Sequence, residues 1–244
     1  KSQTYTSYAY HEKQVYNRDL ICNELGLNCN LPIVIIASHV FNDVPHGYRH
    51  RIFVDYYEWL VETLNICSKI DYINWIVKEH PQVGDKKHNY NVDQTAKKLV
   101  MDDYKSVPNI KLAPDNMSNI SLASFCHAIV TVSSTMSHEL AYFGIPSILA
   151  GDSSVSSCGF THNARNFEEY KSMLFSLTNL GKLTSEQIEK AYVAYAILFY
   201  FSRVESDFSL PGNIFDAINN MVNKKIIQGS KIELDPYFRN LVIQ

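Results

Sequence analysis

The chain has 244 residues, of which 46% are hydrophobic and 19% are charged, and its formal net charge is −3. This composition predicts a globular protein with a sizeable core, and no basic stripe of the kind that binds nucleic acid is visible. The longest apolar runs, residues 32–37 and 191–201, are too short or too polar to span a bilayer, and no signal peptide opens the chain, so we expect a cytoplasmic protein.

The five cysteines are odd in number and show no CxxC spacing. This pattern predicts neither a disulfide framework nor a zinc site. We therefore expect free thiols in a reducing compartment.

Five short apolar runs, bounded by Gly, Pro and polar residues, predict buried strands. The runs are residues 32–38, 72–78, 109–113, 128–132 and 147–150. Apolar residues at helical spacing predict helices between and around them, over residues 12–25, 51–68, 93–101, 118–126, the stretch after 135, 166–177, 184–203 and 213–223. Alternation of strands and helices from residue 32 to about 180 predicts an α/β fold with a doubly wound, Rossmann-like parallel sheet.

The chain is expected to divide into three parts. Residues 1–30 are a polar and aromatic lead-in, residues 31–180 hold the Rossmann-like domain, and residues 181–244 form C-terminal helices and a tail. Residues 151–165 are rich in Gly, Ser and Asn, so they predict a long irregular loop that is functional or mobile.

The stretch 128–151 organises the rest of the chain, because it predicts strand, polar turn, helix and strand in succession. The turn consists of Ser133, Ser134 and Thr135. Hydroxyl groups and unpaired backbone N–H groups at a helix N-terminus attract phosphate. An alternative is a plain helix cap, since Ser and Thr are good N-cap residues.

Polar residues also follow two other predicted strands. His39 and Asp43 come after the first strand, and Lys78, His80 and Pro81 close the second. Carboxyl ends of parallel strands share one edge, where ligands bind in open α/β sheets, so these groups can converge on one ligand. His80 could donate to a phosphate, with Lys78 adding charge; otherwise it is a loop histidine bonded to a neighbouring carbonyl.

Glu139 falls one helical turn after Thr135. A carboxylate there could accept hydrogen bonds from a ribose diol, or could simply be stabilised by the helix dipole. The pair of His39 and Asp43 suggests a general base. A metal site formed with His46 is disfavoured, since no further ligands are apparent.

Several familiar motifs are absent from the sequence. Without GxGxxG or GxxxxGK[ST], standard dinucleotide and P-loop binding are disfavoured. Without GxSxG, Ser134 is a poor candidate for a hydrolase nucleophile.

A strand that ends at His80-Pro81, a second that ends at Ser133-Ser134, then Glu139 and Gly144-Ile145-Pro146 resemble the C-terminal, donor-binding half of GT-B glycosyltransferases. Among these the chain looks most like bacterial surface-polysaccharide enzymes with HP and SS motifs: capsule Kdo transferases, polysialyltransferases and polyglycerolphosphate transferases, which use CMP- or CDP-activated donors. The resemblance covers residues 32–180.

The resemblance implies roles for the motif residues. His80, Ser133, Ser134 and Thr135 would contact the donor phosphate, and Glu139 the ribose. It further implies a nucleotide-sugar substrate, a polysaccharide or glycolipid acceptor, no metal cofactor, and possible peripheral association with the inner face of the membrane.

The chain departs from the GT-B pattern because it holds one Rossmann-like domain where a full enzyme has two. The missing N-terminal domain, which normally contributes the catalytic base, would then be a partner, and the chain alone could bind a donor without turnover. Within the chain, Asp43 or His39 is the candidate base.

Two other functions remain open. The first is a sugar-nucleotide 2-epimerase, which shares the fold and a His-Pro-like motif but resembles a Gly-rich turn where this chain has Ser133, Ser134 and Thr135. The second is a non-catalytic α/β module that binds a partner through aromatic helices.

Overall fold

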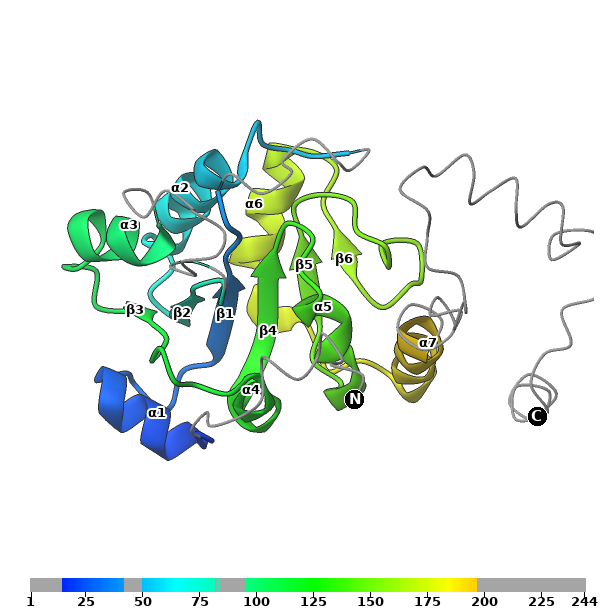
Figure 1. Ribbon diagram of the computed structural model, residues 1–244, viewed down its shortest axis with the longest axis horizontal. Coiled ribbons are helices and arrows are strands. Elements are labelled where there is room, and N and C mark those ends of the chain that lie inside the picture. The colour runs from blue at the N-terminus through cyan, green and yellow to red at the C-terminus, as the bar shows by residue number, and fades with distance from the viewer. Residues whose placement is uncertain (1–14, 42–49, 82, 84–94, 197–244) are drawn as a thin grey trace, which may run out of the picture. The chain divides into compact units, whose positions relative to one another are not determined.

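The computed structural model describes residues 15–41, 50–81, 83 and 95–196. These residues form a six-stranded parallel sheet in the order β3-β2-β1-β4-β5-β6 (Figure 1). The strands are β1 (Ile33–Ala37), β2 (Asn74–Lys78), β3 (Ile110–Leu112), β4 (Cys126–Thr131), β5 (Ser147–Leu149) and β6 (His162–Asn163). The predicted doubly wound sheet is thereby confirmed.

The sheet reverses its order of growth between β1 and β4. From β1 the chain adds β2 and β3 on one side, and from β4 it adds β5 and β6 on the other. Such a reversal opens a crevice between the carboxyl ends of the two central strands, which is the ligand position in folds of this kind.

Five strands lie where their apolar runs predicted them, within a few residues at each end. The sixth, β6, was not predicted and falls inside the loop 151–165, so that loop is not wholly irregular. It has two residues, which pair with Ile148 and Leu149. A strand this short and polar shows no periodicity in the sequence.

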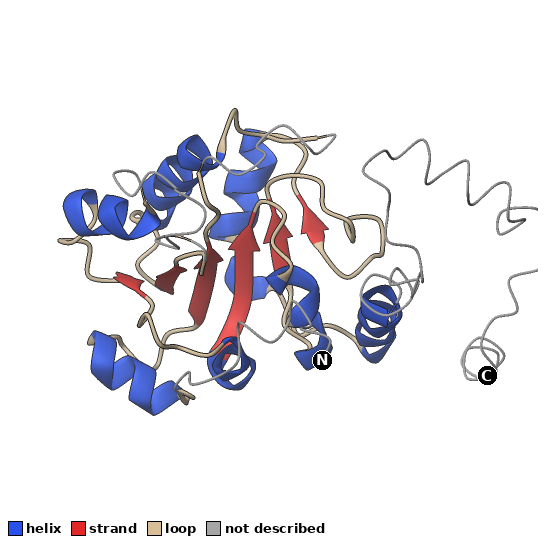
Figure 2. Cartoon of the chain, viewed as in Figure 1, coloured by secondary structure: helices blue, strands red, loops and turns tan. Residues whose placement is uncertain are grey.

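Helices cover both faces of the sheet (Figure 2). They are α1 (Arg18–Leu25), α2 (Tyr56–Cys67), α3 (Ala96–Asp103), α4 (Asn119–Phe125), α5 (Met136–Glu139), α6 (Phe167–Phe175) and α7 (Ser185–Ala196), with short 3-10 turns η2 (Ala141–Phe143) and η3 (Leu177–Asn179). Buried side chains of α2, α3 and α6 form one core with β1, β2 and β4, whereas those of α1, α4 and α5 form a second core on the other face.

Burial on both faces explains the strand sequences. All five residues of β1, Ile-Val-Ile-Ile-Ala, are buried, as is usual for a strand covered by helices on each side. Ile33 and Ile35 belong to one core, and Val34 and Ile36 to the other. Alternate side chains thus tie the two helical layers to the same strand.

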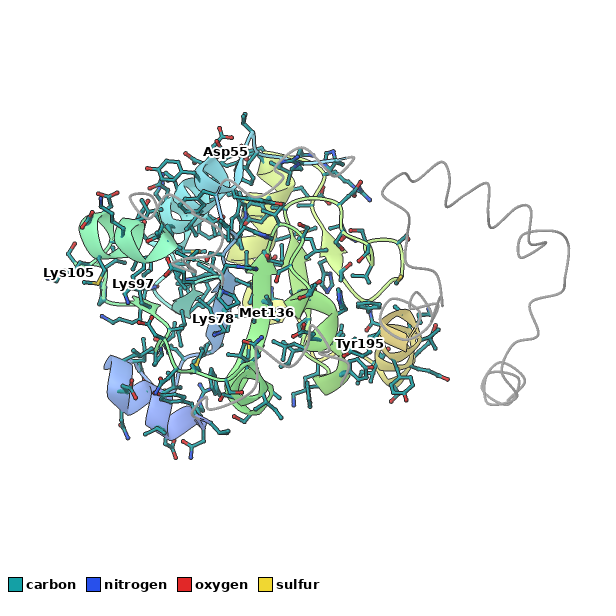
Figure 3. The ribbon with its side chains drawn as sticks, viewed as in Figure 1. Asp55, Lys78, Lys97, Lys105, Met136 and Tyr195 are labelled. Carbon is teal, nitrogen blue, oxygen red and sulfur yellow. The ribbon has the colours of Figure 1, made fainter. Side chains whose placement is uncertain are left out.

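Helix α2 begins later than the sequence predicted. The expected start was residue 51, but Arg51 pairs with Gly151 in an antiparallel bridge, and the helix begins at Tyr56. Asp55, labelled in Figure 3, caps it by accepting a hydrogen bond from the Glu58 amide at 2.7 Å. The Glu58 carboxylate accepts in return from the Val54 amide at 2.6 Å. These two bonds satisfy amides on either side of the cap residue and fix the helix start.

Helices α2 and α6, which share one core, are joined through a buried tyrosine. Nε1 of Trp59 donates to the hydroxyl of Tyr170 at 2.9 Å, and Oγ1 of Thr63 lies 2.8 Å from the same oxygen. All three residues are fully buried. Every polar atom at this contact between α2 and α6 therefore has a partner.

Other predicted segments meet the structure in part. Helix α1 falls within the predicted lead-in, and its Ile21 and Cys22 pack into the second core. The predicted helix 184–203 is described as far as Ala196, and the predicted helix 213–223 lies outside the described residues. No helix in the described ranges is long and apolar enough to cross a membrane.

Candidate functional site

The candidate site lies where the sheet reverses order, at the carboxyl ends of β1, β4 and β2. There β1 continues into Ser38 and His39, and β4 continues through Val132 into the turn 133–135. The amide of Ser38 donates to the carbonyl of Lys78 at 3.0 Å, which holds the end of β2 alongside. The three predicted loops therefore share one edge, as the parallel sheet requires.

His39 bridges the two central strands. Its Nε2 lies 3.0 Å from Oγ1 of Thr131, and its ring stacks on Tyr56 with centroids 4.2 Å apart. Burial, with a smaller contribution from nearby His80, lowers the pKa of His39 to about 3. The imidazole is therefore neutral at physiological pH, and such a weak base favours a positioning role over proton abstraction.

The hydrogen bonds of Thr131 assign the tautomer of His39. Oγ1 of Thr131 donates to the carbonyl of Ala37 at 2.9 Å, so it can only accept from Nε2 of His39, which then carries the proton. The amide of Ser133 lies 3.4 Å from this same nitrogen. Because Nε2 is already a donor, it cannot satisfy that amide.

The turn 133–135 therefore presents a run of backbone N–H groups. The amides of Ser134 and Thr135 donate to no acceptor within the described ranges, and the Ser133 amide faces a protonated nitrogen. The turn is held to the helix that follows it, because the Ser134 carbonyl accepts from the amide of Ser137 at 3.1 Å and from its hydroxyl at 2.8 Å. Successive free N–H groups in a rigid turn form an anion-binding concavity.

The hydroxyl groups of the turn differ in their partners. Oγ of Ser133 makes no hydrogen bond to any described residue, and Oγ of Ser134 accepts a long bond of 3.3 Å from the Met136 amide. Thr135 is exposed and donates to a carboxylate oxygen of Glu139 at 3.1 Å. Two half-buried serine hydroxyls are thus available to a ligand, while Thr135 orients Glu139.

The helix after the turn is shorter than the sequence suggested. Helix α5 has four residues, and the chain then passes through η2 and ends the turn at Gly144, whose φ is 74°. A macrodipole grows with the number of aligned peptide units, so four residues supply little of it. Attraction for an anion at this edge comes from the local N–H groups of the turn.

Side chains at the end of β2 make hydrogen bonds to other parts of the protein. Nζ of Lys78 donates to the carbonyl of Met117 at 3.2 Å, and the Glu79 carboxylate accepts from the Lys97 amide at 2.9 Å, which caps α3 (Figure 3). His80 is half-buried and lies close enough to His39 to lower its pKa, whereas Pro81 is exposed. Of this group, His80 is the one placed beside the reversal point.

The predicted residues are therefore brought together in part. His39, His80 and the turn share the edge, and Glu139 joins them through Thr135. Asp43, with His46, lies outside the described residues. No three His, Cys, Asp or Glu side chains among the described residues gather as a metal ion would need.

One residue at this edge was missed by the sequence analysis. Residues 50–52 cross the end of β5, with the Ile52 amide donating to Ala150 at 3.2 Å and the Asp152 amide donating to His50 at 2.8 Å. This places Arg51 opposite Gly151. Nη1 of Arg51 is buried and has no hydrogen-bond acceptor in the described part of the chain.

Arg51 also lies beside the turn. A Cβ atom built on Gly151 would stand 2.9 Å from Cγ1 of Val132 and 3.3 Å from Cγ of Arg51, so those two carbons are at most 6.2 Å apart, the sum of the distances. Val132 directly precedes Ser133. The guanidinium is thus within reach of the turn, and the sequence signal that could have revealed this was a glycine directly after a strand.

Comparisons with known proteins give similarity of fold at low sequence identity. No protein-family model and no curated protein matches the chain. The solved β-Kdo 2,4-transferase KpsC of Thermosulfurimonas dismutans has a TM-score of 0.44 and 16% identity, over 80% of this chain and 53% of that chain. UDP-GlcNAc 2-epimerase from Neisseria meningitidis has a TM-score of 0.45 and 15% identity, over 73% and 48%.

A third solved structure is the wall teichoic acid polymerase TagF, with a TM-score of 0.42 and 12% identity over 86% of this chain and 46% of that one. The chain thus spans about half the length of the solved structures it matches.

Proposed function

We propose that this chain is the donor-binding domain of a glycosyltransferase that transfers a sugar from a CMP-activated donor to a growing bacterial surface polysaccharide. The observation that carries the proposal is the turn 133–135: three backbone N–H groups without a proper acceptor and two serine hydroxyls, at the reversal point of a doubly wound sheet. The HP and SS motifs, which follow β2 and β4 on either side of β1, support the same assignment.

Catalysis by this domain would consist of stabilising the leaving nucleotide. When the bond between sugar and phosphate breaks, negative charge grows on the phosphate oxygens. Donors that are already aimed at that position lower the barrier because they need no reorganisation. The turn amides, Ser133, Ser134 and His80 supply hydrogen bonds, and Arg51 supplies a full positive charge. These donors act without a metal ion.

The remaining roles follow from position. Glu139, oriented by Thr135, binds the ribose hydroxyls of the donor. His39 stays neutral and braces the ends of β1 and β4. The acceptor hydroxyl needs a base, for which Asp43 is the candidate within this chain, and the second domain of a complete enzyme would present the acceptor.

The test is calorimetric titration of the protein with CMP, CDP, UMP and UDP, with and without magnesium. We expect one cytidine nucleotide to bind in the absence of metal. Preference for UDP would favour the epimerase instead, and no binding by any of the four would contradict donor binding by this domain. Arg51→Gln should weaken the binding of the nucleotide. It should leave the binding of cytidine, which has no phosphate, unchanged.

A further inference from the structure

The opposite edge of the sheet holds a separate cleft. It has a volume of about 420 Å³ and is lined by residues at the amino ends of β1 and β4, among them Pro32 and Cys126. Its apolar wall is formed by Pro32, Phe125 and Ile145. Small-molecule sites usually measure about 300 to 1,000 Å³, so this cleft is large enough for a small metabolite.

The two charged groups of the cleft, Arg18 and Lys182, are both positive. His127 adds an imidazole, and no Asp or Glu lines the cleft. Lys182 is exposed and makes no ion pair with any described residue. The adjacent Leu183 holds it in place by donating its amide to the carbonyl of Gly144 at 2.9 Å. Cationic donors around a cleft with no carboxylate favour an anionic ligand.

Arg18 is fixed by the backbone and keeps one donor group free. Its Nε and Nη2 donate to the Cys29 carbonyl at 3.1 and 2.9 Å, and Nη2 also donates to the Leu31 carbonyl at 2.6 Å. Nη1 has no acceptor among the described residues. A guanidinium braced in this way loses little freedom when it binds an anion.

His127 is aimed by an irregularity in β4. Ile33 pairs with Cys126 and the next residue, Val34, pairs with Ala128, so His127 is the extra residue of a β-bulge. Bulges redirect a side chain and are common beside binding sites. Nε2 of His127 is buried and has no hydrogen-bond partner within the described ranges. A buried polar atom left without a partner costs free energy in the folded chain.

We propose that this cleft binds a small phosphate monoester, such as a sugar phosphate. Two cationic donors on separate segments, Arg18 and Lys182, suit the oxygens of a phosphate, with the His127 imidazole beside them, and the apolar wall suits the carbon skeleton of the ester. The proposal is independent of donor binding at the carboxyl edge. However, His127 at the start of β4 lines this cleft, and the same strand leads to the turn 133–135. An experiment must therefore distinguish binding in the cleft from binding at the turn.

The experiment titrates the whole chain with glucose 1-phosphate, inorganic phosphate and uncharged glucose, followed by calorimetry and by the NMR signals of the His127 imidazole. The test variants are Lys182→Gln and His127→Gln; Arg18 is left alone because it braces the loop before β1. Lys105→Gln is the matched control, since Lys105 (Figure 3) is an exposed lysine just after α3 and does not line the cleft.

We expect glucose 1-phosphate to shift the His127 signals and each test variant to weaken binding about tenfold, as the loss of one charge-assisted hydrogen bond does. Lys105→Gln should bind as the unaltered chain does. Stronger binding of glucose 1-phosphate than of inorganic phosphate identifies an ester site, and the reverse identifies a site for free phosphate. Lys182 is exposed, so its variant remains informative if His127→Gln fails to fold.

Three results would overturn the proposal: neither phosphate shifts the His127 signals, Lys105→Gln weakens binding as much as Lys182→Gln, or glucose binds as well as its phosphate. The proposal would also be overturned if Ser133→Ala with Ser134→Ala weakened the binding of glucose 1-phosphate while the cleft variants did not. The phosphate would then bind at the carboxyl ends of the strands.

Discussion

His39 and Thr131 join the two strands between which the sheet reverses its order: Nε2 of His39 lies 3.0 Å from Oγ1 of Thr131. The same threonine donates to Ala37 on β1. This chain of bonds ties the ends of β1 and β4 together directly before the turn 133–135. The site is thus prepared by a buried neutral histidine.

The buried histidines predict how stability depends on pH. The pKa of His39 is lowered from 6.5 to about 3, mainly by burial, and burial lowers that of His138 to about 4. Above pH 6.5 both are neutral in the folded and the unfolded chain. Below it the unfolded chain takes up protons first, so stability falls as the pH drops from 6.5 toward 4.

For each such histidine, the free energy of unfolding changes by at most about 1.4 kcal/mol per pH unit. Urea unfolding at a series of pH values measures it, and His39→Gln should make the slope shallower. A slope unchanged by that substitution would mean that His39 takes up its proton in the folded protein.

The serines of the turn should matter for binding and not for folding. In Ser133→Ala with Ser134→Ala the fold loses one long bond, of 3.3 Å, in the described ranges. A bound phosphate loses two charge-assisted bonds, so we expect the affinity for CMP to fall about tenfold or more. Calorimetry measures the affinity and thermal unfolding the stability; Ser185→Ala, an exposed serine at the start of α7, is the control. Unchanged CMP affinity in the double variant would remove these hydroxyls from the site.

Gly151 lies between the Arg51 segment and Val132, the residue that follows β4. A methyl group there would meet Cγ1 of Val132 at 2.9 Å and the His50 carbonyl at 3.2 Å. Gly151→Ala should therefore destabilise the fold by about 1–3 kcal/mol and weaken nucleotide binding by displacing Arg51. Gly181→Ala is the matched control, because nothing lies within 4 Å of its added carbon. If the two variants unfolded at the same urea concentration, the close approach of Val132 and the His50 carbonyl to Gly151 would be contradicted.

The contact between α2 and α6 predicts that removing the hydroxyl of Tyr170 costs more stability than removing that of Tyr72. Tyr170→Phe removes the partner of both Trp59 Nε1 and Thr63 Oγ1 in the core, so we expect a loss of about 1–3 kcal/mol in the free energy of unfolding. Tyr72→Phe removes an exposed hydroxyl bonded to the Phe175 carbonyl, and it should change stability by less than about 0.5 kcal/mol. Chemical denaturation compares the two, and similar losses would argue against the buried network.

Much of the sheet could be predicted from the sequence, because a fully buried strand such as β1 needs an unbroken apolar run. Convergence of the Ser133 and His39 loops also followed, since parallel strands place their carboxyl ends at one edge. The length of α5 could not be predicted, since the apolar spacing continues through η2 and only Gly144 stops it.

Long-range pairing explains what the sequence did not reveal. Arg51 read as the start of a helix, and only its bridge to Gly151, a hundred residues later, brings it to the site. His127 lies between the predicted helix 118–126 and the predicted strand 128–132, and its place in β4 depends on a shift in register against β1. Apart from the glycine that directly follows β5, neither feature leaves a local pattern, because both arise from contacts between distant segments.

The most direct measurement follows the backbone amides of Ser133, Ser134 and Thr135 by NMR while CMP is added. If the phosphate sits on the turn, these three amide protons shift downfield together and saturate, because each gains a charged acceptor that it lacks in the free protein. The central claim would be contradicted if CMP bound while these three signals stayed in place.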